Sequence, residues 1–189
     1  MGTYSLTLVI ATFLGCAAAH GELNLSPRLA EFEGEGLKFH HLVFADGGQE
    51  VTYQQPAGWD FSGGPTKLTL HPKDKISAEA TVTRVPQGTP LMLDEAGLKK
   101  LVDDAQATLP AGSTDIQILS QEKDAVKIGT KETFLVTMAY VSNGQRFGRS
   151  LLFMGRGNEL IRFQLICRLE DFKDLHEEFR RSYFTWHNL

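Results

Sequence analysis

Among the side chains that could bind a ligand, arginine has the most uneven distribution along this sequence. Seven of the nine arginines lie within residues 146–189, where eight basic and six acidic side chains give a net charge of +2. Residues 20–145 carry eleven basic and seventeen acidic side chains, a net charge of −6. Because the planar guanidinium group suits carboxylates, phosphates and protein surfaces, the C-terminal quarter predicts a docking surface for a protein partner or an anionic ligand.

The residues that we expect to bind this partner are Arg146, Arg149, Arg162 and Arg168. A simpler interpretation is that the arginines only solvate the outer face of a sheet. They would then form surface ion pairs, which contribute little, with Glu159, Glu170 and Asp171.

A second kind of chemistry depends on where the mature chain begins. If a leader ends at Ala19, His20 becomes the first residue, and an N-terminal histidine can bind copper through its amine and its ring. A second histidine would be needed, and the candidates are His40, His41, His71 and His176. The alternative is a frayed terminus without metal. His40 and His41 are neighbours in a predicted strand, so their side chains point to opposite faces and do not share one ion.

Other familiar chemical signatures are missing from the sequence. The chain has no Gly-x-Ser-x-Gly elbow, and Gly155-Arg156-Gly157 continues into neither a P-loop nor a dinucleotide fingerprint. Acidic residues at 31, 33 and 35 alternate without the spacing of an EF-hand, which favours a solvated segment over a calcium site. Cys167 lies among apolar residues and is expected to fill the core. We therefore predict no catalytic residue and no cofactor, and an enzyme or metal-binding protein that uses His20 remains the alternative.

The first residues indicate export. An uncharged apolar run at 6–14 is followed by Gly15-Cys16-Ala17-Ala18-Ala19, the pattern of a signal peptide over residues 1–19. The run is too short for a permanent membrane anchor, so we expect no transmembrane segment after cleavage. A secreted or periplasmic protein is predicted. Cys16 loosely matches a bacterial lipobox, and a lipoprotein anchored through Cys16 is the alternative.

Composition predicts one folded domain that does not bind nucleic acid. The 189 residues are 42% hydrophobic and 22% charged, which suffices for one sizeable core. With a net charge of −4, the protein lacks the excess of basic residues that is typical of a nucleic-acid-binding protein. Residues 20–36 are polar and interrupted by proline and glycine, which predicts a flexible lead-in, and residues 37–189 form the expected domain.

The most secure structural prediction is an antiparallel meander over residues 131–168. Its segments 133–141, 146–154 and 159–167 are joined by short turns, and Asn143-Gly144 is the strongest short-range signal for a hairpin. In the third segment Ile161, Phe163, Leu165 and Cys167 share one face, whereas Arg162, Gln164 and Arg168 share the other.

Helical periodicity appears twice, near residues 94–109 and 170–185, and each helix has an apolar stripe. Strands are predicted at 37–44, 50–55, 66–71, 77–85 and 115–120. Strands, helix, strands, helix is an α+β order. We expect a mainly antiparallel sheet with the two amphipathic helices packed on it.

Two short motifs resemble a known family. Tyr53-Gln-Gln-Pro56-Ala-Gly-Trp59 resembles the Tyr-x-x-Pro-x-x-Trp opening of the superfamily of PsbP, the photosystem II extrinsic protein, and its bacterial relatives. Phe179-Arg-Arg-Ser182-Tyr183-Phe184 resembles the aromatic-Ser-aromatic end of their final helix. The likeness covers about residues 37–187 and implies an α/β/α sandwich and a small non-catalytic domain that binds or helps to assemble something larger. It transfers no residue role.

Overall fold

The computed structural model describes residues 22–34 and 37–188. In this part of the chain the strands form two antiparallel sheets. The small sheet has the order β1 (Leu23–Gly34), β2 (Leu37–Asp46), β3 (Gln49–Tyr53) and β11 (His187–Asn188). The large sheet has the order β4 (Trp59–Gly64), β5 (Lys67–Pro72), β6 (Glu79–Pro86), β10 (Glu159–Arg168), β9 (Gln145–Arg156), β8 (Thr133–Ser142) and β7 (Thr114–Lys123).

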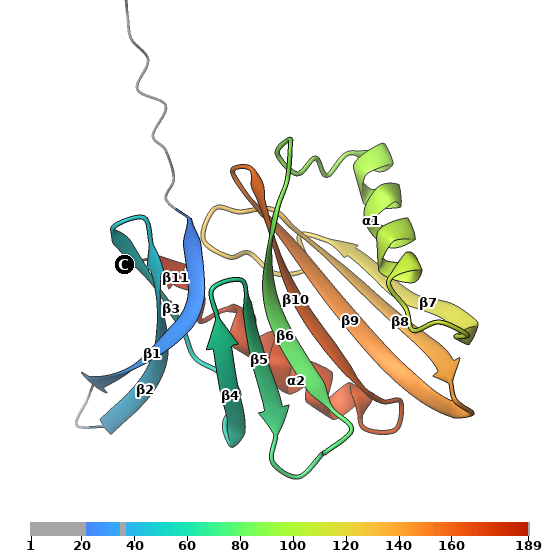
Figure 1. The fold of residues 1–189 in the computed structure, drawn as a ribbon, viewed down its shortest axis with the longest axis horizontal. Coiled ribbons are helices and arrows are strands. Elements are labelled where there is room, and N and C mark those ends of the chain that lie inside the picture. The colour runs from blue at the N-terminus through green and yellow to red at the C-terminus, as the bar shows by residue number, and fades with distance from the viewer. Residues whose placement is uncertain (1–21, 35–36, 189) are drawn as a thin grey trace, which may run out of the picture.

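Helices α1 (Glu95–Ala107) and α2 (Phe172–Tyr183) lie on opposite sides of the large sheet (Figure 1). Asp94 caps α1 by accepting a hydrogen bond from the backbone N–H of Gly97 at 2.8 Å. The predicted α+β class, mainly antiparallel with two packed helices, is confirmed.

The predicted meander is the centre of the large sheet. Strands β8, β9 and β10 pair in sequence, and Asn143 and Gly144 have φ values of 49° and 71°. Positive φ at both central residues is what a type I′ hairpin requires, and the Asn-Gly pair provides it at little steric cost. This turn fixes the register of β8 on β9, the strand that carries Arg146 and Arg149.

Alternate residues of the meander fill two separate cores. Ile161, Phe163, Leu165 and Cys167 are fully buried, as predicted, in a core shared by the small sheet and α2. On the other face Leu151, Phe153 and Leu160 pack with Leu101 and Ala105 of α1. The molecule therefore has three layers, with the large sheet in the middle and helices on both sides.

The two motifs of the family resemblance meet at α2. Trp59 stacks on Phe179 with ring centres 6.1 Å apart, and the Tyr53 hydroxyl lies 2.7 Å from the hydroxyl oxygen of Ser182. Ser182 donates to the backbone oxygen of Phe179 at 2.6 Å, so Tyr53 is the donor in its own contact with Ser182. These contacts attach α2 to the sheets.

Strand β1 corrects the prediction of a flexible lead-in at 20–36. Residues 23–34 pair with β2, and Leu23 and Leu25 are completely buried in the core. The sequence of this segment looks irregular because most of its exposed side chains are polar and because it contains Pro27. Pro27 lies where the register shifts, between Asn24 and Arg28. β1 is an edge strand of the small sheet, and an edge strand tolerates both features.

Neither described helix is long and apolar enough to cross a membrane. The predicted signal peptide, Cys16 and His20 lie outside the described residues.

Candidate functional site

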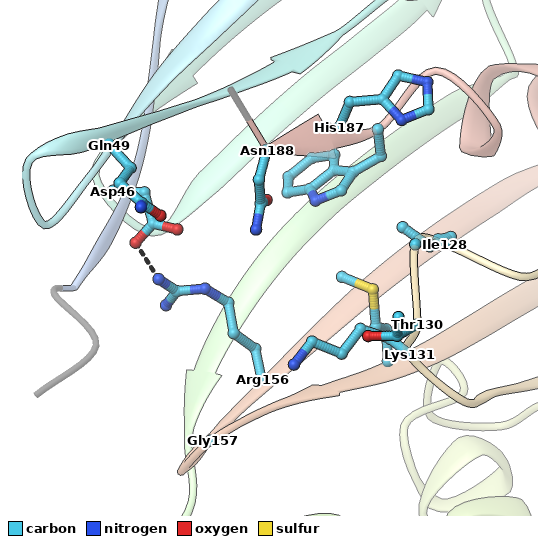
Figure 2. Close-up of a pocket in the computed structure, with 12 residues that line it drawn as sticks. Asp46, Gln49, Ile128, Thr130, Lys131, Arg156, Gly157, His187 and Asn188 are labelled. Carbon is cyan, nitrogen blue, oxygen red and sulfur yellow. Dashed lines mark hydrogen bonds and ion pairs between the residues drawn. The ribbon is translucent and has the colours of Figure 1, made fainter. Parts of the chain in front are cut away.

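A pocket of about 390 Å³ lies where the two sheets meet. Four segments that are distant in sequence line it: 46–49, 128–131, 154–157 and 186–188 (Figure 2). This volume is within the range of small-molecule sites.

The base of the pocket is apolar and rigid. Ile128, Met154 and Trp186 line it, yet each is at most 4% exposed because most of its surface belongs to the core. Trp186 stacks on Phe44 at 5.6 Å and meets the edge of Phe163 at 5.3 Å. A base held in this way needs little rearrangement to receive a ligand.

Two basic side chains reach the pocket from different segments. Arg156 is at the end of β9. Lys131 is the last residue of the turn 128–131, in which its backbone N–H donates to the Ile128 carbonyl at 3.0 Å. Gly129 has a φ of 59°, a conformation that most side chains disfavour, so glycine suits this turn. Figure 2 shows the side chain of Lys131 extending toward Arg156.

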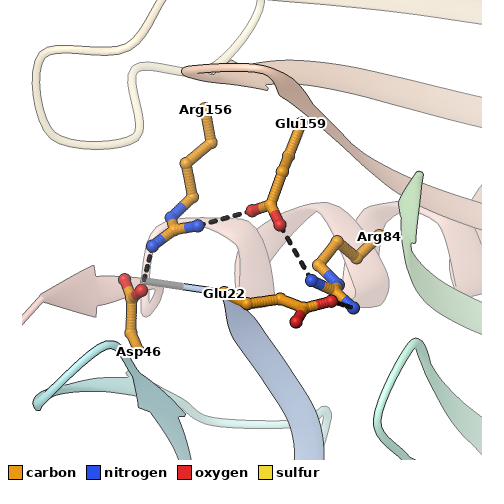
Figure 3. Close-up of polar contacts among 5 residues, drawn as sticks. All are labelled: Glu22, Asp46, Arg84, Arg156 and Glu159. Atoms are coloured by element: carbon orange, nitrogen blue, oxygen red, sulfur yellow. Dashed lines mark hydrogen bonds and ion pairs between the residues drawn. The ribbon is translucent and has the colours of Figure 1, made fainter. Parts of the chain in front are cut away.

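Arg156 belongs to a chain of alternating charges (Figure 3). Its guanidinium donates to Asp46 on β2 and to Glu159 on β10, and Glu159 also accepts a hydrogen bond from Arg84 on β6 at 2.9 Å. Arg84 continues to Glu22. Asp46 and Arg84 are each 7% exposed. Buried charges are costly unless paired in this manner, so this chain of ion pairs joins the two sheets beside the pocket.

Lys131 carries the unbalanced charge of the pocket. Asp46 and Arg156 are paired with each other, whereas within residues 22–34 and 37–188 Lys131 makes no ion pair, and its side chain is exposed. An ammonium group beside a partly apolar cavity attracts an anionic group, because the neighbouring low-dielectric protein screens the charge less than water does.

Comparisons with known proteins find a likeness of fold only. No protein-family model matches the chain, and no curated protein matches it in sequence. Solved structures with a similar arrangement include a protein from Bacteroides thetaiotaomicron, with 14% identity and a TM-score of 0.48 over 74% of this chain and 45% of that one. Cyanobacterial PsbP from Synechocystis has 12% identity and a TM-score of 0.46, over 96% and 99% of the two chains.

A third similar structure is LpqN of Mycobacterium tuberculosis, a protein involved in cell envelope biogenesis. Its identity is 12% and its TM-score 0.41, over 88% of this chain and 82% of that one. A PsbP is among these structures, as the two motifs predicted. The resemblance is one of fold.

The four arginines predicted to bind a partner do not form one surface. Arg146 is exposed on the α2 side of β9, whereas Arg149, Arg162 and Arg168 lie on the α1 side. Arg168 lies over the ring of Phe147 at 4.8 Å and donates to Gln145 at 2.7 Å. Its predicted role in partner binding stays a prediction, as does that of Arg146.

Arg149 is a correction, because it is only 3% exposed and lies beneath the end of α1. It donates to the Ala105 carbonyl at 2.9 Å, to the Thr108 hydroxyl at 3.0 Å and to the side-chain oxygen of Gln164. Burial, with a smaller contribution from the charge of Arg162, lowers its pKa to about 10. Arg149 therefore stabilises the C-terminal end of α1, where carbonyl groups lack partners, and presents no surface to another molecule.

The remaining candidates include one cysteine and two histidines, and each contacts other residues of the fold. Cys167 is fully buried, and burial followed by the charge of Asp171 raises its pKa to about 12. His40 lies 3.7 Å from Glu31, and His41 packs against Phe32 with ring centres 4.9 Å apart. No group of three potential metal ligands occurs within the described residues.

Sequence reasoning missed Lys131 and Asp46. Asp46 lies between the strands predicted at 37–44 and 50–55, and Lys131 is the first residue of the predicted meander. The glycine at 129 was the available signal of a tight turn before Lys131, but nothing in sequence spacing places residue 131 near residues 46 and 186.

Proposed function

We propose that this protein is a non-enzymatic binding or accessory module of the cell envelope, exported by its first 19 residues, and that the pocket between its sheets binds a ligand with an anionic group. The observation that carries the proposal is Lys131: an exposed ammonium group without an ion pair in the described chain, beside a pocket with a rigid apolar base.

The pocket geometry supports one kind of ligand. Trp186, Met154 and Ile128 offer an apolar contact, and Lys131 offers a charge at one side. A molecule with an apolar body and one carboxylate or phosphate fits both features. Whether the ligand is a free molecule or part of a protein partner determines whether the module is a carrier or an assembly factor, and the pocket contacts are the same in both cases.

Backbone amide NMR of the mature protein tests the proposal. Octanoate, benzoate and phenyl phosphate serve as probes, and we expect saturable shifts in residues 129–131 and 186–188. Lys131→Glu should weaken binding by about tenfold, which corresponds to about 1.4 kcal/mol. Lys127→Glu, an exposed lysine in the same loop that does not line the pocket, is the matched control and should leave affinity unchanged. Shifts scattered over the surface, or equal affinity in both variants, would refute the pocket as the binding site.

Sequencing the N-terminus of the exported protein tests its location. A start at His20 or Glu22 agrees with a secreted or periplasmic protein, and a lipidated Cys16 agrees with an anchored one. Stoichiometric copper in protein that begins at His20 would favour the metal-binding alternative. Retention of residues 1–19 in the cytoplasm would contradict export.

A further inference from the structure

Three donor side chains form a row across the large sheet, away from the pocket. Lys67 on β5 is directly opposite Thr83 on β6, and Thr83 is directly opposite Arg162 on β10. Arg162 in turn faces Phe153, which belongs to the core under α1, so the row lies on the α1 face. The pocket includes Met154, whose side chain belongs to the core on the opposite face.

Neither helix covers this part of the α1 face. Lys67 is exposed and Thr83 and Arg162 are half-buried, whereas α1 packs beside them on residues of β8, β9 and β10. Figure 1 shows α1 over the other half of the sheet, away from β4, β5 and β6. At the edge of the row, Gly64 of β4 is opposite Lys67 and adds no side chain.

Two polar atoms in the row lack hydrogen-bond partners. The Thr83 hydroxyl oxygen and the Arg162 Nε are both buried and unpartnered in the described structure. A buried donor without a partner costs about 1–3 kcal/mol, so native proteins rarely leave two such atoms side by side. Thr83 and Arg162 are directly paired, so one acceptor reaches both atoms once the side chains that cover them move aside.

Positive charge at this position is also unbalanced. Within the described residues Arg162 makes no ion pair, and the neighbouring Arg149 has only neutral hydrogen-bond partners. The side-chain oxygen of Gln164 is occupied by Arg149, which leaves its amide nitrogen as a further donor near Arg162. Glu79 lies on the same face but pairs with Lys67 at 3.6 Å, and it is opposite Ile166 rather than Arg162.

We propose that the row Lys67–Thr83–Arg162 binds an oxyanion, which accepts hydrogen bonds from the Thr83 hydroxyl and the Arg162 Nε–H and is flanked by Lys67. Neighbouring strands are about 4.8 Å apart, so Lys67 and Arg162 bracket a space about 10 Å wide above Thr83. That span suits one phosphate, sulfate or carboxylate group held between two long basic side chains. The site does not depend on the pocket or on Lys131.

NMR follows this contact directly through the chemical shift of the Arg162 Nε–Hε group. We expect saturable movement of this resonance on titration with sodium phosphate, sodium sulfate or sodium acetate at ionic strength held constant with sodium chloride. Preference for phosphate or sulfate identifies a tetrahedral oxyanion, and preference for acetate identifies the carboxylate of a partner; either outcome supports the site. A resonance that stays in place at saturating concentrations of all three overturns it.

Variants assign the contact to its residues. Because Arg162→Gln has no Nε–Hε group, binding to the variants is followed through the backbone amide resonances of residues 67, 83 and 162. Arg162→Gln should weaken binding at least tenfold, and Thr83→Val, which keeps the shape and removes the hydroxyl, about threefold to tenfold. Lys173→Gln, an exposed lysine on α2, is the control and should bind like the parent. Equal affinity in Arg162→Gln and the parent would place the anion elsewhere. The Lys131→Glu substitution does not alter this oxyanion site. A negative result at the oxyanion site can therefore be told apart from a negative result at the pocket.

Discussion

At the scale of single residues, arginines that look alike in sequence have different tasks. Arg149 stabilises a helix end, Arg156 joins the two sheets through Asp46, and Arg162 has no ion pair within the described chain. What separates them is the element that covers each one. Strand periodicity assigned Arg162 and Arg168 correctly to the face opposite Ile161, but it did not show that α1 buries Arg149.

Arg149→Met should destabilise the protein by about 2–4 kcal/mol. The substitution keeps much of the volume, but it leaves the Gln164 oxygen without its donor and the Ala105 carbonyl with only the Thr108 hydroxyl as a donor. Urea unfolding measures the change. Arg146→Met, on the same strand but exposed, is the control and should change stability by less than about 0.5 kcal/mol. Equal effects in the two variants would contradict a structural role for Arg149.

His176 predicts a pH dependence of stability. Burial, followed by the charge of Arg180, lowers the pKa of His176, although Glu122 and Glu177 act in the opposite direction. Its ring stacks on Phe172 and its Nε2 is buried without a partner. As pH falls below the ordinary value of 6.5, the unfolded chain binds a proton that the folded chain does not, so the folded state loses stability.

Thermal unfolding of His176→Phe checks this expectation. Between pH 7.5 and 5.5 the parent should lose more stability than the variant, because phenylalanine retains the stacking and cannot be protonated. Parallel pH profiles for the two proteins would show that another group controls the acid side.

At the scale of elements, local signals predicted the parts that are local. The meander and both helices follow from turn chemistry and periodicity within short windows, and their observed bounds lie within a few residues of the predicted ones. Strand β1 and strand β4 were missed. Each is short of apolar residues on its outer face, and each owes its structure to pairing and to packing on the core.

Leu25→Ala tests whether β1 is an integral strand. Leu25 is completely buried, so its truncation should cost about 2–4 kcal/mol in unfolding free energy. Leu29→Ala, in the same strand at 52% exposure, should cost less than about 0.5 kcal/mol. If both variants unfold at the same urea concentration as the parent, residues 23–34 behave as the lead-in that the sequence suggested.

At the scale of the whole molecule, the candidate pocket results from topology. Its four lining segments are brought together only when the small sheet packs against the large one, and the ion pairs from Asp46 to Arg84 hold that junction. Sequence spacing therefore contained no signal for the pocket, although the sequence did predict an exported α+β domain that docks a protein or an anionic partner. The uneven charge of the chain predicted that partner surface, but it did not point to Lys131.

The most direct measurement is native mass spectrometry of the protein isolated from its own cells. We predict a discrete bound mass on the parent and on the Lys127→Glu variant, and its loss from Lys131→Glu, whose fold should be unaffected because Lys131 makes no ion pair within the described residues. A parent without any bound mass, or an equal bound mass on Lys131→Glu, would contradict the claim that this pocket binds an anionic ligand.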